Sequence, residues 1–358
     1  MLAAMRPLFN RYFHLIFFGL FFALAGCVLL VRPIWDEWVY LELADHVLSS
    51  PFNPFDPMLG WIPHPPLLWY LLAVLRSVPR MAPLLISALG IVFLFYVCKR
   101  LYGTEVGRLS VAVLVSTVSY LLYSVVTFPD SLLMTFMSMV VLSFLCWIKL
   151  EDRKFLWFSG LGLALASMTK YTAVPILSAT LLVWLLILRK RFNWANFSRF
   201  SAVMAASLLP LVLWVYRLSQ FYGDLVHHYF SAYEVFPSNW LSRFMFNLPL
   251  FAPIPFLLIG FPLISWARKR PFDLDSKLLL IYSVVIPIFF CFITPEYAIE
   301  TGPPYFRYSL PMIPALAVIS ARSLAKEKVL TRLLILCPQF FCASCVSLVT
   351  ILSATAAG

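Results

Sequence analysis

The chain has 358 residues, of which 62% are hydrophobic and only 12% are charged. Soluble proteins carry roughly a quarter charged residues, so this composition excludes a soluble enzyme, a disordered chain and a fibrous protein, and it indicates an integral membrane protein. The formal net charge is nevertheless +11, which taken alone would suggest a nucleic-acid partner.

Apolar segments recur along the whole chain. A membrane-spanning helix needs about 20 mostly apolar residues, and eleven segments are candidates, two of which are short for a full span. They are about Phe13–Val31, Met81–Val97, Leu109–Phe128, Leu132–Ile148, Phe155–Ser167, Thr172–Leu188, Phe200–Tyr216, Phe246–Trp266, Leu278–Ile293, Tyr308–Ser320 and Leu333–Leu352. We therefore expect an all-α integral membrane protein, a polytopic bundle of about 11 transmembrane helices. It would form one membrane domain over residues 1–358 with no appended soluble domain.

Two short motifs inside these apolar segments have more than one interpretation. Leu24–Cys27 resembles a lipoprotein cleavage box, but the apolar run continues beyond the cysteine, which favours an uncleaved first helix. Gly160 and Gly162 lack the third glycine of a dinucleotide-binding turn. In a membrane helix they favour close packing against a neighbouring helix instead.

The charged residues predict how the bundle is oriented. Basic loop residues are retained on the cytoplasmic side. If the N-terminus is cytoplasmic, alternate loops hold 20 basic and 6 acidic residues inside, a net charge of +14, and 7 basic and 10 acidic residues outside, a net charge of −3. The basic character is therefore a topology signal, and we expect no nucleic-acid partner. We expect the protein in the cell (plasma or inner) membrane, with long outer loops at about 32–80, 217–245 and 294–307.

The first outer loop contains adjacent carboxylates just after the first predicted span. Pro33 ends that helix, and Asp36–Leu48 has the pattern of a short amphipathic helix at the membrane interface, with Asp36 and Glu37 at its N-terminus. Neighbouring side chains on a helix diverge by about 100°. One carboxylate can therefore act as a base while the other orients it or holds structure. The alternative is that both only stabilise the helix terminus.

A few cations lie at predicted outer helix ends, where an anion could bind. Arg80, Lys170 and Arg307 stand at such ends; either they bind substrate, as charges beside membrane helices often do, or they are interfacial side chains that extend to water. Asp130 could orient Lys170 or Arg307, or could cap the helix that follows it. His64, which precedes Pro65-Pro66-Leu67, could donate to a phosphate or be an interfacial histidine.

Five motifs in chain order resemble those of protein O-mannosyltransferases and aminoarabinose-to-lipid-A transferases, two groups of GT-C membrane glycosyltransferases. The motifs are Asp36-Glu37 followed by Pro65-Pro66-Leu67, Arg80-Met-Ala-Pro-Leu-Leu, Phe128-Pro129-Asp130-Ser131, the segment from Gly160 to Thr169-Lys170-Tyr171, and Tyr305-Phe-Arg307-Tyr308-Ser-Leu-Pro. The resemblance spans Asp36 to Ala321. In the lipid-A branch the residue before Pro-Pro-Leu is usually lysine and here is His64, and the large outer C-terminal domain of the family is missing.

This resemblance implies a polyprenyl-phosphate-linked sugar donor, and a lipid, glycan or protein acceptor, at the extracytoplasmic side. Asp36 would be the general base, with Glu37 in support. Lys170 and Arg307, with Arg80 or His64, would stabilise the phosphate leaving group. Asp130, Tyr171 and Tyr305 would lie behind these residues.

We expect no cofactor and a metal-independent site. A divalent metal stays an alternative, although the adjacent His227 and His228 make poor co-ligands.

Two other classes of protein stay open at this stage. A secondary transporter or lipid flippase places ionisable residues near the membrane midplane, often in two related halves. Here the charges collect at outer helix ends and no halves repeat. A non-catalytic membrane scaffold that kept the fold is the second alternative, and the presence of Asp36, Lys170 and Arg307 argues against it.

Overall fold

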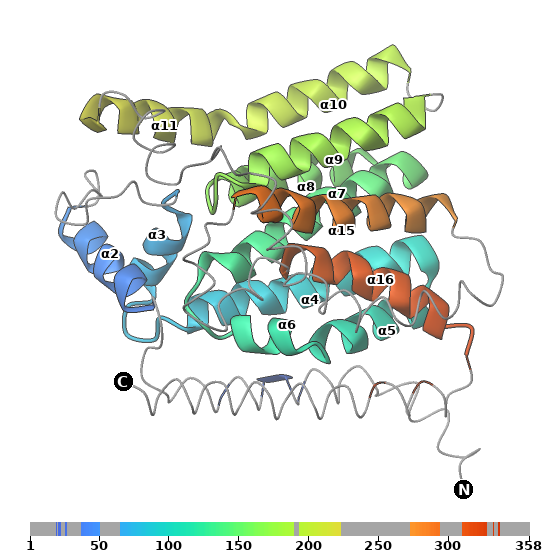
Figure 1. Ribbon diagram of the computed structural model, residues 1–358, viewed down its shortest axis with the longest axis horizontal. Coiled ribbons are helices and arrows are strands. Elements are labelled where there is room, and N and C mark those ends of the chain that lie inside the picture. The colour runs from blue at the N-terminus through green and yellow to red at the C-terminus, as the bar shows by residue number, and fades with distance from the viewer. Residues whose placement is uncertain are drawn as a thin grey trace, which may run out of the picture.

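The computed structural model describes residues 37–50, 65–189, 193–222, 273–293 and 310–327, with isolated positions at 19, 21, 22, 26, 332 and 336. Within this part of the chain the regular elements are helices, which confirms the all-α prediction (Figure 1). They are α2 (Glu37–Ser49), α3 (Leu67–Val74), α4 (Met81–Tyr102), α5 (Thr104–Val115), α6 (Val118–Tyr123), α7 (Pro129–Leu150), α8 (Arg153–Ser167), α9 (Ala173–Leu188), α10 (Trp194–Ser207), α11 (Leu209–Tyr222), α15 (Leu274–Ile293) and α16 (Ile313–Leu324).

Three stretches of helix are long and apolar enough to cross a membrane. They are Met81–Tyr102, Pro129–Leu150 and Trp194–Gln220, and α9 and Leu310–Leu324 are shorter apolar helices. The protein is therefore a helical membrane protein. The predicted spans Phe246–Trp266 and Leu333–Leu352 lie outside the described residues, apart from Leu336, as does most of Phe13–Val31. The count of about eleven spans stays a prediction.

Two predicted spans are each divided into two helices. Leu109–Phe128 was expected to be one helix, but α5 ends at Val115 and α6 begins at Val118. The hydroxyls of Ser116 and Thr117 both donate to the carbonyl of Val113, at 2.9 and 3.0 Å. Such local bonds compete with the helical pattern, and Thr117 is extended, with φ −94° and ψ 126°.

The second division lies between α10 and α11, within the predicted span Phe200–Tyr216. It falls at Leu208, two residues before Pro210. Proline has no N–H to donate to the preceding turn. Each division therefore reflects local backbone chemistry that hydropathy does not register.

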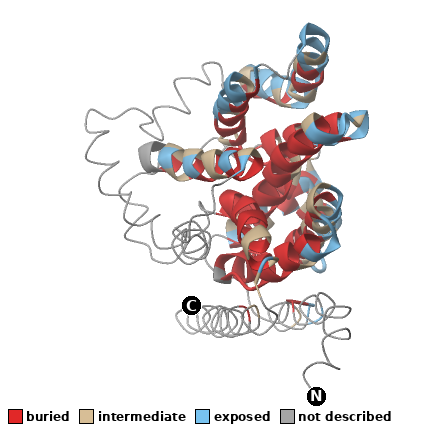
Figure 2. Cartoon of the chain, turned by 90° about the vertical axis from the view of Figure 1, so that its right-hand side faces the viewer, coloured by how far each residue is buried: buried red, intermediate tan, exposed pale blue. Residues whose placement is uncertain are grey.

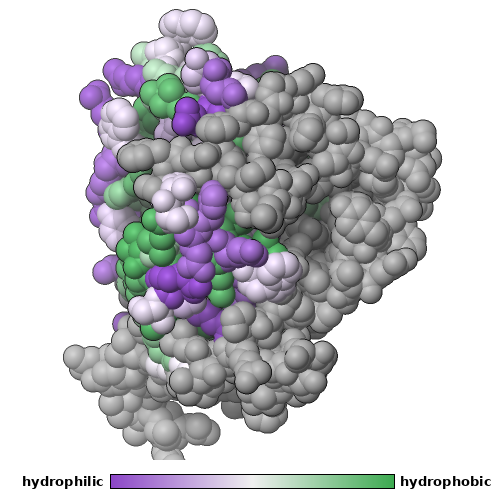
Figure 3. Space-filling view, turned by 90° about the vertical axis from the view of Figure 1, so that its left-hand side faces the viewer, coloured by the Kyte–Doolittle hydropathy of each residue, from purple (hydrophilic) through white to green (hydrophobic). Residues whose placement is uncertain are grey.

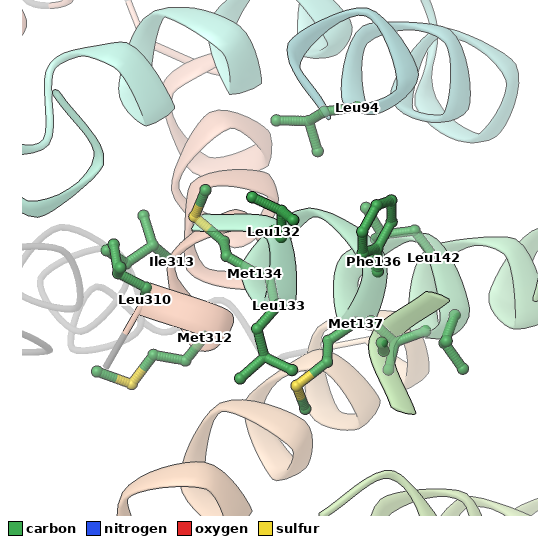
Figure 4. Packing of buried hydrophobic residues seen from close by; sticks show 14 of the residues in the cluster. Leu94, Leu132, Leu133, Met134, Phe136, Met137, Leu142, Leu310, Met312 and Ile313 are labelled. Atoms are coloured by element: carbon green, nitrogen blue, oxygen red, sulfur yellow. The ribbon is translucent and has the colours of Figure 1, made fainter. Parts of the chain in front are cut away.

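Helix α7 is the centre of the bundle. In its most apolar window 89% of the residues are buried, against 44% for the corresponding window of α4. Helix α7 packs on its neighbours α4 and α8, and buried residues are concentrated in the interior of the described helices (Figure 2). Figure 4 shows Leu132, Leu133, Met134 and Met137 of α7 near Leu310, Met312 and Ile313 at the start of α16. The interior is thus an apolar core arranged around one helix.

The two glycines of α8 allow this close packing. A Cβ atom built on Gly162 would lie 3.0 Å from the backbone oxygen of Phe136 and from the backbone nitrogen of Val140, both in α7. One on Gly160 would lie 2.6 Å from Cγ1 of Val203 in α10. The expectation of close helix packing is confirmed: Gly162 allows close approach to α7, and Gly160 allows close approach to α10.

Helices α2 and α3 lie together at one end of the bundle, on the left in Figure 1. The predicted helix Asp36–Leu48 is observed as Glu37–Ser49. Leu43 and Val47 on its apolar side are buried, and Val39 is half-buried. Seen from this end, hydrophilic side chains gather beside a hydrophobic area (Figure 3). The first outer loop therefore contributes packed structure to this end of the molecule.

Candidate active site

A buried carboxylate–guanidinium pair joins the starts of α2 and α4. Arg80, the residue before α4, donates from Nε to Oε1 of Glu37 at 3.0 Å and from Nη2 to Oε2 at 2.6 Å. Glu37 is the first residue of α2, and the two residues are 1% and 5% exposed. A two-pronged bond of this kind fixes orientation as well as distance. Arg80 therefore holds the N-terminus of α2 in place.

The backbone before α7 binds the same carboxylate. The N–H of Thr127 donates to Oε1 of Glu37 at 2.7 Å. Thr127 comes just before Phe128-Pro129, and Pro129 is the first residue of α7. Glu37 therefore ties together α2, α4 and the segment that leads into α7, and both of its oxygens are used.

A second buried ion pair lies three residues further along. Asp130, in the first turn of α7, accepts a hydrogen bond from Nζ of Lys170 at 2.8 Å. Lys170 follows α8, and the side chains are 7% and 1% exposed for Lys170 and Asp130. The four residues 127–130 therefore connect two buried ion pairs, with a backbone N–H bonded to one and a side chain bonded to the other.

Aromatic rings surround the same short segment. Phe128 packs against Tyr40 of α2, with ring centroids 5.9 Å apart, and against Tyr123 of α6 at 6.1 Å. Phe128 itself is fully buried. These contacts exclude water from the backbone between the ion pairs, and electrostatic interactions are stronger in such an environment.

The end of α8 is also joined to α3 and α11. The N–H of Leu67, the first residue of α3, donates to the carbonyl of Met168 at 3.1 Å. Tyr171 accepts a hydrogen bond from Nε1 of Trp214 at 3.0 Å, and the Trp69 and Trp214 rings meet edge to face with centroids 6.1 Å apart. The Lys170–Tyr171 turn is therefore held from both sides.

Several polar atoms near these turns are buried and have no hydrogen-bond partner among the described residues. They are Oδ2 of Asp130, Oγ1 of Thr127, Oγ1 of Thr172 and Nε1 of Trp69. A buried polar atom left without a partner costs about 1–3 kcal/mol. This end of the bundle thus has unused capacity to bind polar groups, which is typical of a ligand site.

The structure brings together five of the predicted site residues around these turns: Glu37, Arg80, Asp130, Lys170 and Tyr171. Asp36, His64, Tyr305 and Arg307 lie outside the described residues, as do His227 and His228. Within the described ranges, no group of three or more His, Cys, Asp or Glu side chains could hold a metal ion.

Sequence reasoning missed Thr127, Trp69 and Trp214. Thr127 acts through its backbone, which leaves no side-chain signal. The two tryptophans could have been noticed only as aromatics near predicted outer helix ends.

The comparisons with known proteins bear on this arrangement. Residues 54–216 match the model of the dolichyl-phosphate-mannose-protein mannosyltransferase family. The structure of ArnT from Cupriavidus metallidurans bound to undecaprenyl phosphate superposes with a TM-score of 0.69 at 18% identity, covering 88% of this chain and 60% of that one. The same protein in its apo state gives a TM-score of 0.68. The chain has the GT-C fold of membrane glycosyltransferases.

A further GT-C-fold neighbour is the archaeal oligosaccharyltransferase AglB from Archaeoglobus fulgidus, solved with an inhibitory peptide and a dolichol-phosphate. It has a TM-score of 0.58 at 13% identity, covering 95% of this chain and 56% of that one. The chain thus spans about three fifths of the length of these solved structures. No curated protein matches it by sequence. The GT-C resemblance predicted from the motifs is confirmed, and the matched family region contains Arg80, Asp130, Lys170 and Tyr171.

Proposed function

We propose that the chain transfers a sugar from a polyprenyl-phosphate donor to an acceptor hydroxyl at the extracytoplasmic face of the cell membrane. The family match and the GT-C fold support this assignment. Two of the similar structures hold undecaprenyl phosphate or a dolichol-phosphate, which are both polyprenyl phosphates. A lipid donor of this kind would reach the site from the surrounding membrane.

The proposal rests mainly on two buried ion pairs, Glu37–Arg80 and Asp130–Lys170, that meet at residues 127–130. Removing two charges from water costs several kcal/mol per ion, and buried ionisable groups in membrane proteins are often functional. Both pairs lie at helix starts or ends, at the edge of the apolar core. They suit a site that must bind a charged head group while the lipid tail stays in the membrane.

In this mechanism Asp36 takes the proton of the acceptor hydroxyl as its oxygen attacks the anomeric carbon. The bond between that carbon and the phosphate oxygen breaks, and its electron pair leaves with the lipid phosphate. Attack from the face opposite the leaving group inverts the configuration at the anomeric carbon. The accumulating phosphate charge is stabilised by Lys170 and Arg307, with His64 as a further donor.

The remaining predicted residues would position these groups. Glu37 directly follows Asp36 in the chain and is held by Arg80 and by the N–H of Thr127, so it fixes the backbone from which the base projects. Arg80, predicted as a phosphate donor, would act through Glu37. Asp130 would orient Lys170, and Tyr171 and Tyr305 would support the lysine and Arg307.

Asp36→Asn tests this assignment directly. The purified chain is incubated with a panel of radiolabelled polyprenyl-phosphate sugars and membrane extract, and the labelled product identifies both donor and acceptor class. General-base catalysis contributes about 10²- to 10⁴-fold, so the variant should lose at least about 100-fold in rate while it keeps its unfolding temperature. Asp45→Asn is the matched control, because Asp45 is an exposed carboxylate of α2, a few residues further along the chain.

Three outcomes would contradict the proposal. Near-normal transfer by Asp36→Asn would remove the base assignment. Movement of the labelled lipid across proteoliposome membranes without release of its sugar would indicate a flippase or transporter. No product from any donor in the panel, with a folded protein that binds none of them, would favour a non-catalytic scaffold.

A further inference from the structure

A cavity of about 560 Å³ lies at the end of the bundle opposite α2 and α3. It is formed by the last turn of α7, by Glu151, by the first turns of α8 and by residues 196–203 of α10. Trp147, Trp157, Arg153, Arg199, Glu151 and Asn196 are the aromatic and polar side chains that line it, and Leu156 and Val203 add apolar surface. This volume lies within the range of small-molecule sites, roughly 300–1,000 Å³.

The two arginines of this cavity differ from neighbouring cations. Lys149 is bonded to Asp275 at 2.6 Å, and Lys154 is paired with Asp152 at 2.9 Å. Arg153 and Arg199 are exposed, and neither forms an ion pair with a carboxylate in the described part of the chain. Both guanidinium groups are therefore available to a ligand in the cavity.

The position of the cavity places it at the level of lipid head groups. Helix α7 has 22 residues, so at about 1.5 Å per residue its two ends are roughly 33 Å apart, close to the thickness of the hydrocarbon core. Asp130 stands at one end and the cavity at the other. Tryptophans are enriched at membrane–water interfaces, and Trp157 is 65% exposed.

We propose that this cavity binds the head group of an anionic glycerophospholipid from the membrane leaflet opposite the candidate active site. Guanidinium groups recognise phosphate oxygens with two parallel hydrogen bonds. The two arginines and the carboxylate of Glu151 together carry one excess positive charge, which matches the single negative charge of a phosphatidylglycerol head group. The glycerol hydroxyls of that head group can donate to Glu151 and Asn196.

The apolar part of the cavity distinguishes a lipid from a free phosphate. Leu156, Val203 and the exposed ring of Trp157 offer a surface for the glycerol backbone and the first carbons of an acyl chain. A soluble phosphate would leave this surface uncovered. Basic pockets between membrane helices bind anionic lipid head groups in this way.

The test compares two double variants that remove the same charge from the same end of the bundle. Arg153→Gln/Arg199→Gln changes the cavity, whereas Lys99→Gln/Arg100→Gln changes exposed residues at the end of α4. Binding of phosphatidylglycerol and of phosphatidylcholine with matched acyl chains is measured on the purified full chain in detergent by native mass spectrometry. sn-Glycerol 1-phosphate serves as a competitor without acyl chains.

We expect phosphatidylglycerol affinity to fall at least about 30-fold in the cavity variant, because each arginine would lose charge-assisted hydrogen bonds to the phosphate, a loss of roughly tenfold or more apiece. The α4 variant should lose less than about twofold. Equal losses in both variants, or equal binding of both lipids to the wild type, would overturn the proposal. Full displacement by sn-glycerol 1-phosphate would identify a soluble phosphate ligand instead. Circular dichroism and unfolding temperature check folding, and no step relies on glycosyl transfer.

Discussion

The two ends of helix α7 carry ion pairs of similar composition in different surroundings. At its start, Asp130 bonds to Lys170, and the side chains are 1% and 7% exposed. At its end, Lys149 bonds to Asp275, and the side chains are 35% and 9% exposed. Two further pairs of that end of the bundle, Arg322 with Asp273 and Arg332 with Glu105, each include a carboxylate about half exposed.

This difference supports a distinction between charges that maintain topology and charges that form the proposed site. Exposed ion pairs contribute about 0–1 kcal/mol and are retained at little cost. A buried ion pair is often less stabilising than well-packed apolar side chains of the same volume. Stability alone therefore does not explain why the two buried pairs around residues 127–130 are present. The unpartnered Oδ2 of Asp130 and Oγ1 of Thr127 lie in the same segment, which supports the proposed site at this end of the bundle.

The largest contrast in stability is expected between two matched glutamate variants. Glu37→Gln removes the carboxylate that binds the buried guanidinium of Arg80 through two hydrogen bonds, which should lower the free energy of unfolding by about 3–5 kcal/mol. Glu105→Gln removes the exposed partner of Arg332 and should cost less than about 1 kcal/mol. Denaturant unfolding in detergent micelles, followed by tryptophan fluorescence, measures both.

A double variant makes the same contrast sharper. Glu37→Gln/Arg80→Met removes both charges, so it should recover part of the stability lost in Glu37→Gln, since the buried guanidinium is removed together with its carboxylate. Equal unfolding free energies of the two glutamate variants would show that the Glu37–Arg80 pair does not hold α2 and α4 together. The same conclusion would follow if the double variant lost more stability than the two single variants added together.

The affinity for the lipid donor should depend on Lys170, which is paired at the start of α7, and not on Lys149, which is paired at its end. Lys170→Gln should weaken undecaprenyl phosphate binding roughly tenfold to 100-fold, the range for a lost hydrogen bond to a charged group of about 1.5–3 kcal/mol. Lys149→Gln should leave this affinity unchanged. Isothermal titration in detergent gives both values, with the folded fraction checked by circular dichroism.

Lys170→Arg keeps the charge and separates a binding role from a packing role. It should recover part of the lipid affinity if the cation contacts phosphate. Equal affinity of Lys170→Gln and wild type for the lipid would place the phosphate elsewhere.

Much of this contrast was visible in the sequence, because helix ends and charged residues leave strong signals. Hydropathy located α4, α7, α8 and α9, and sorting the charges by loop selected Arg80 and Lys170 as cations of the outer face. The ion-pair partners of these cations could not be predicted from the sequence in the same way. Glu37 and Arg80 are 43 positions apart, and no local pattern links them. The contribution of Thr127 comes from a backbone N–H that every residue except proline possesses.

The breaks in the helices were hidden for a related reason. Hydropathy averages over a window, whereas the break after α5 depends on the hydroxyls of Ser116 and Thr117. Close packing was easier to foresee from the two glycines, since a Cβ atom at Gly162 would meet the backbone of Phe136 and Val140 and Cγ2 of Val140 in α7.

The smallest expected effect concerns the exposed pair between Asp45 of α2 and Arg76, which follows α3. The hydrogen bond from the Arg76 guanidinium holds the pKa of Asp45 below its usual value of 3.8. A carboxyl whose folded-state pKa is lowered adds stability above its unfolded pKa and loses it as the pH falls through the folded pKa. Asp45→Asn should therefore lower stability by less than about 1 kcal/mol at pH 7, and its difference from wild type should shrink as the pH falls below 3.8. Unfolding temperatures of both proteins at pH 7, 5 and 3 measure this. A difference that grows toward low pH would show that Arg76 does not stabilise the charged form of Asp45, and that the junction of α2 and α3 depends on its apolar contacts alone.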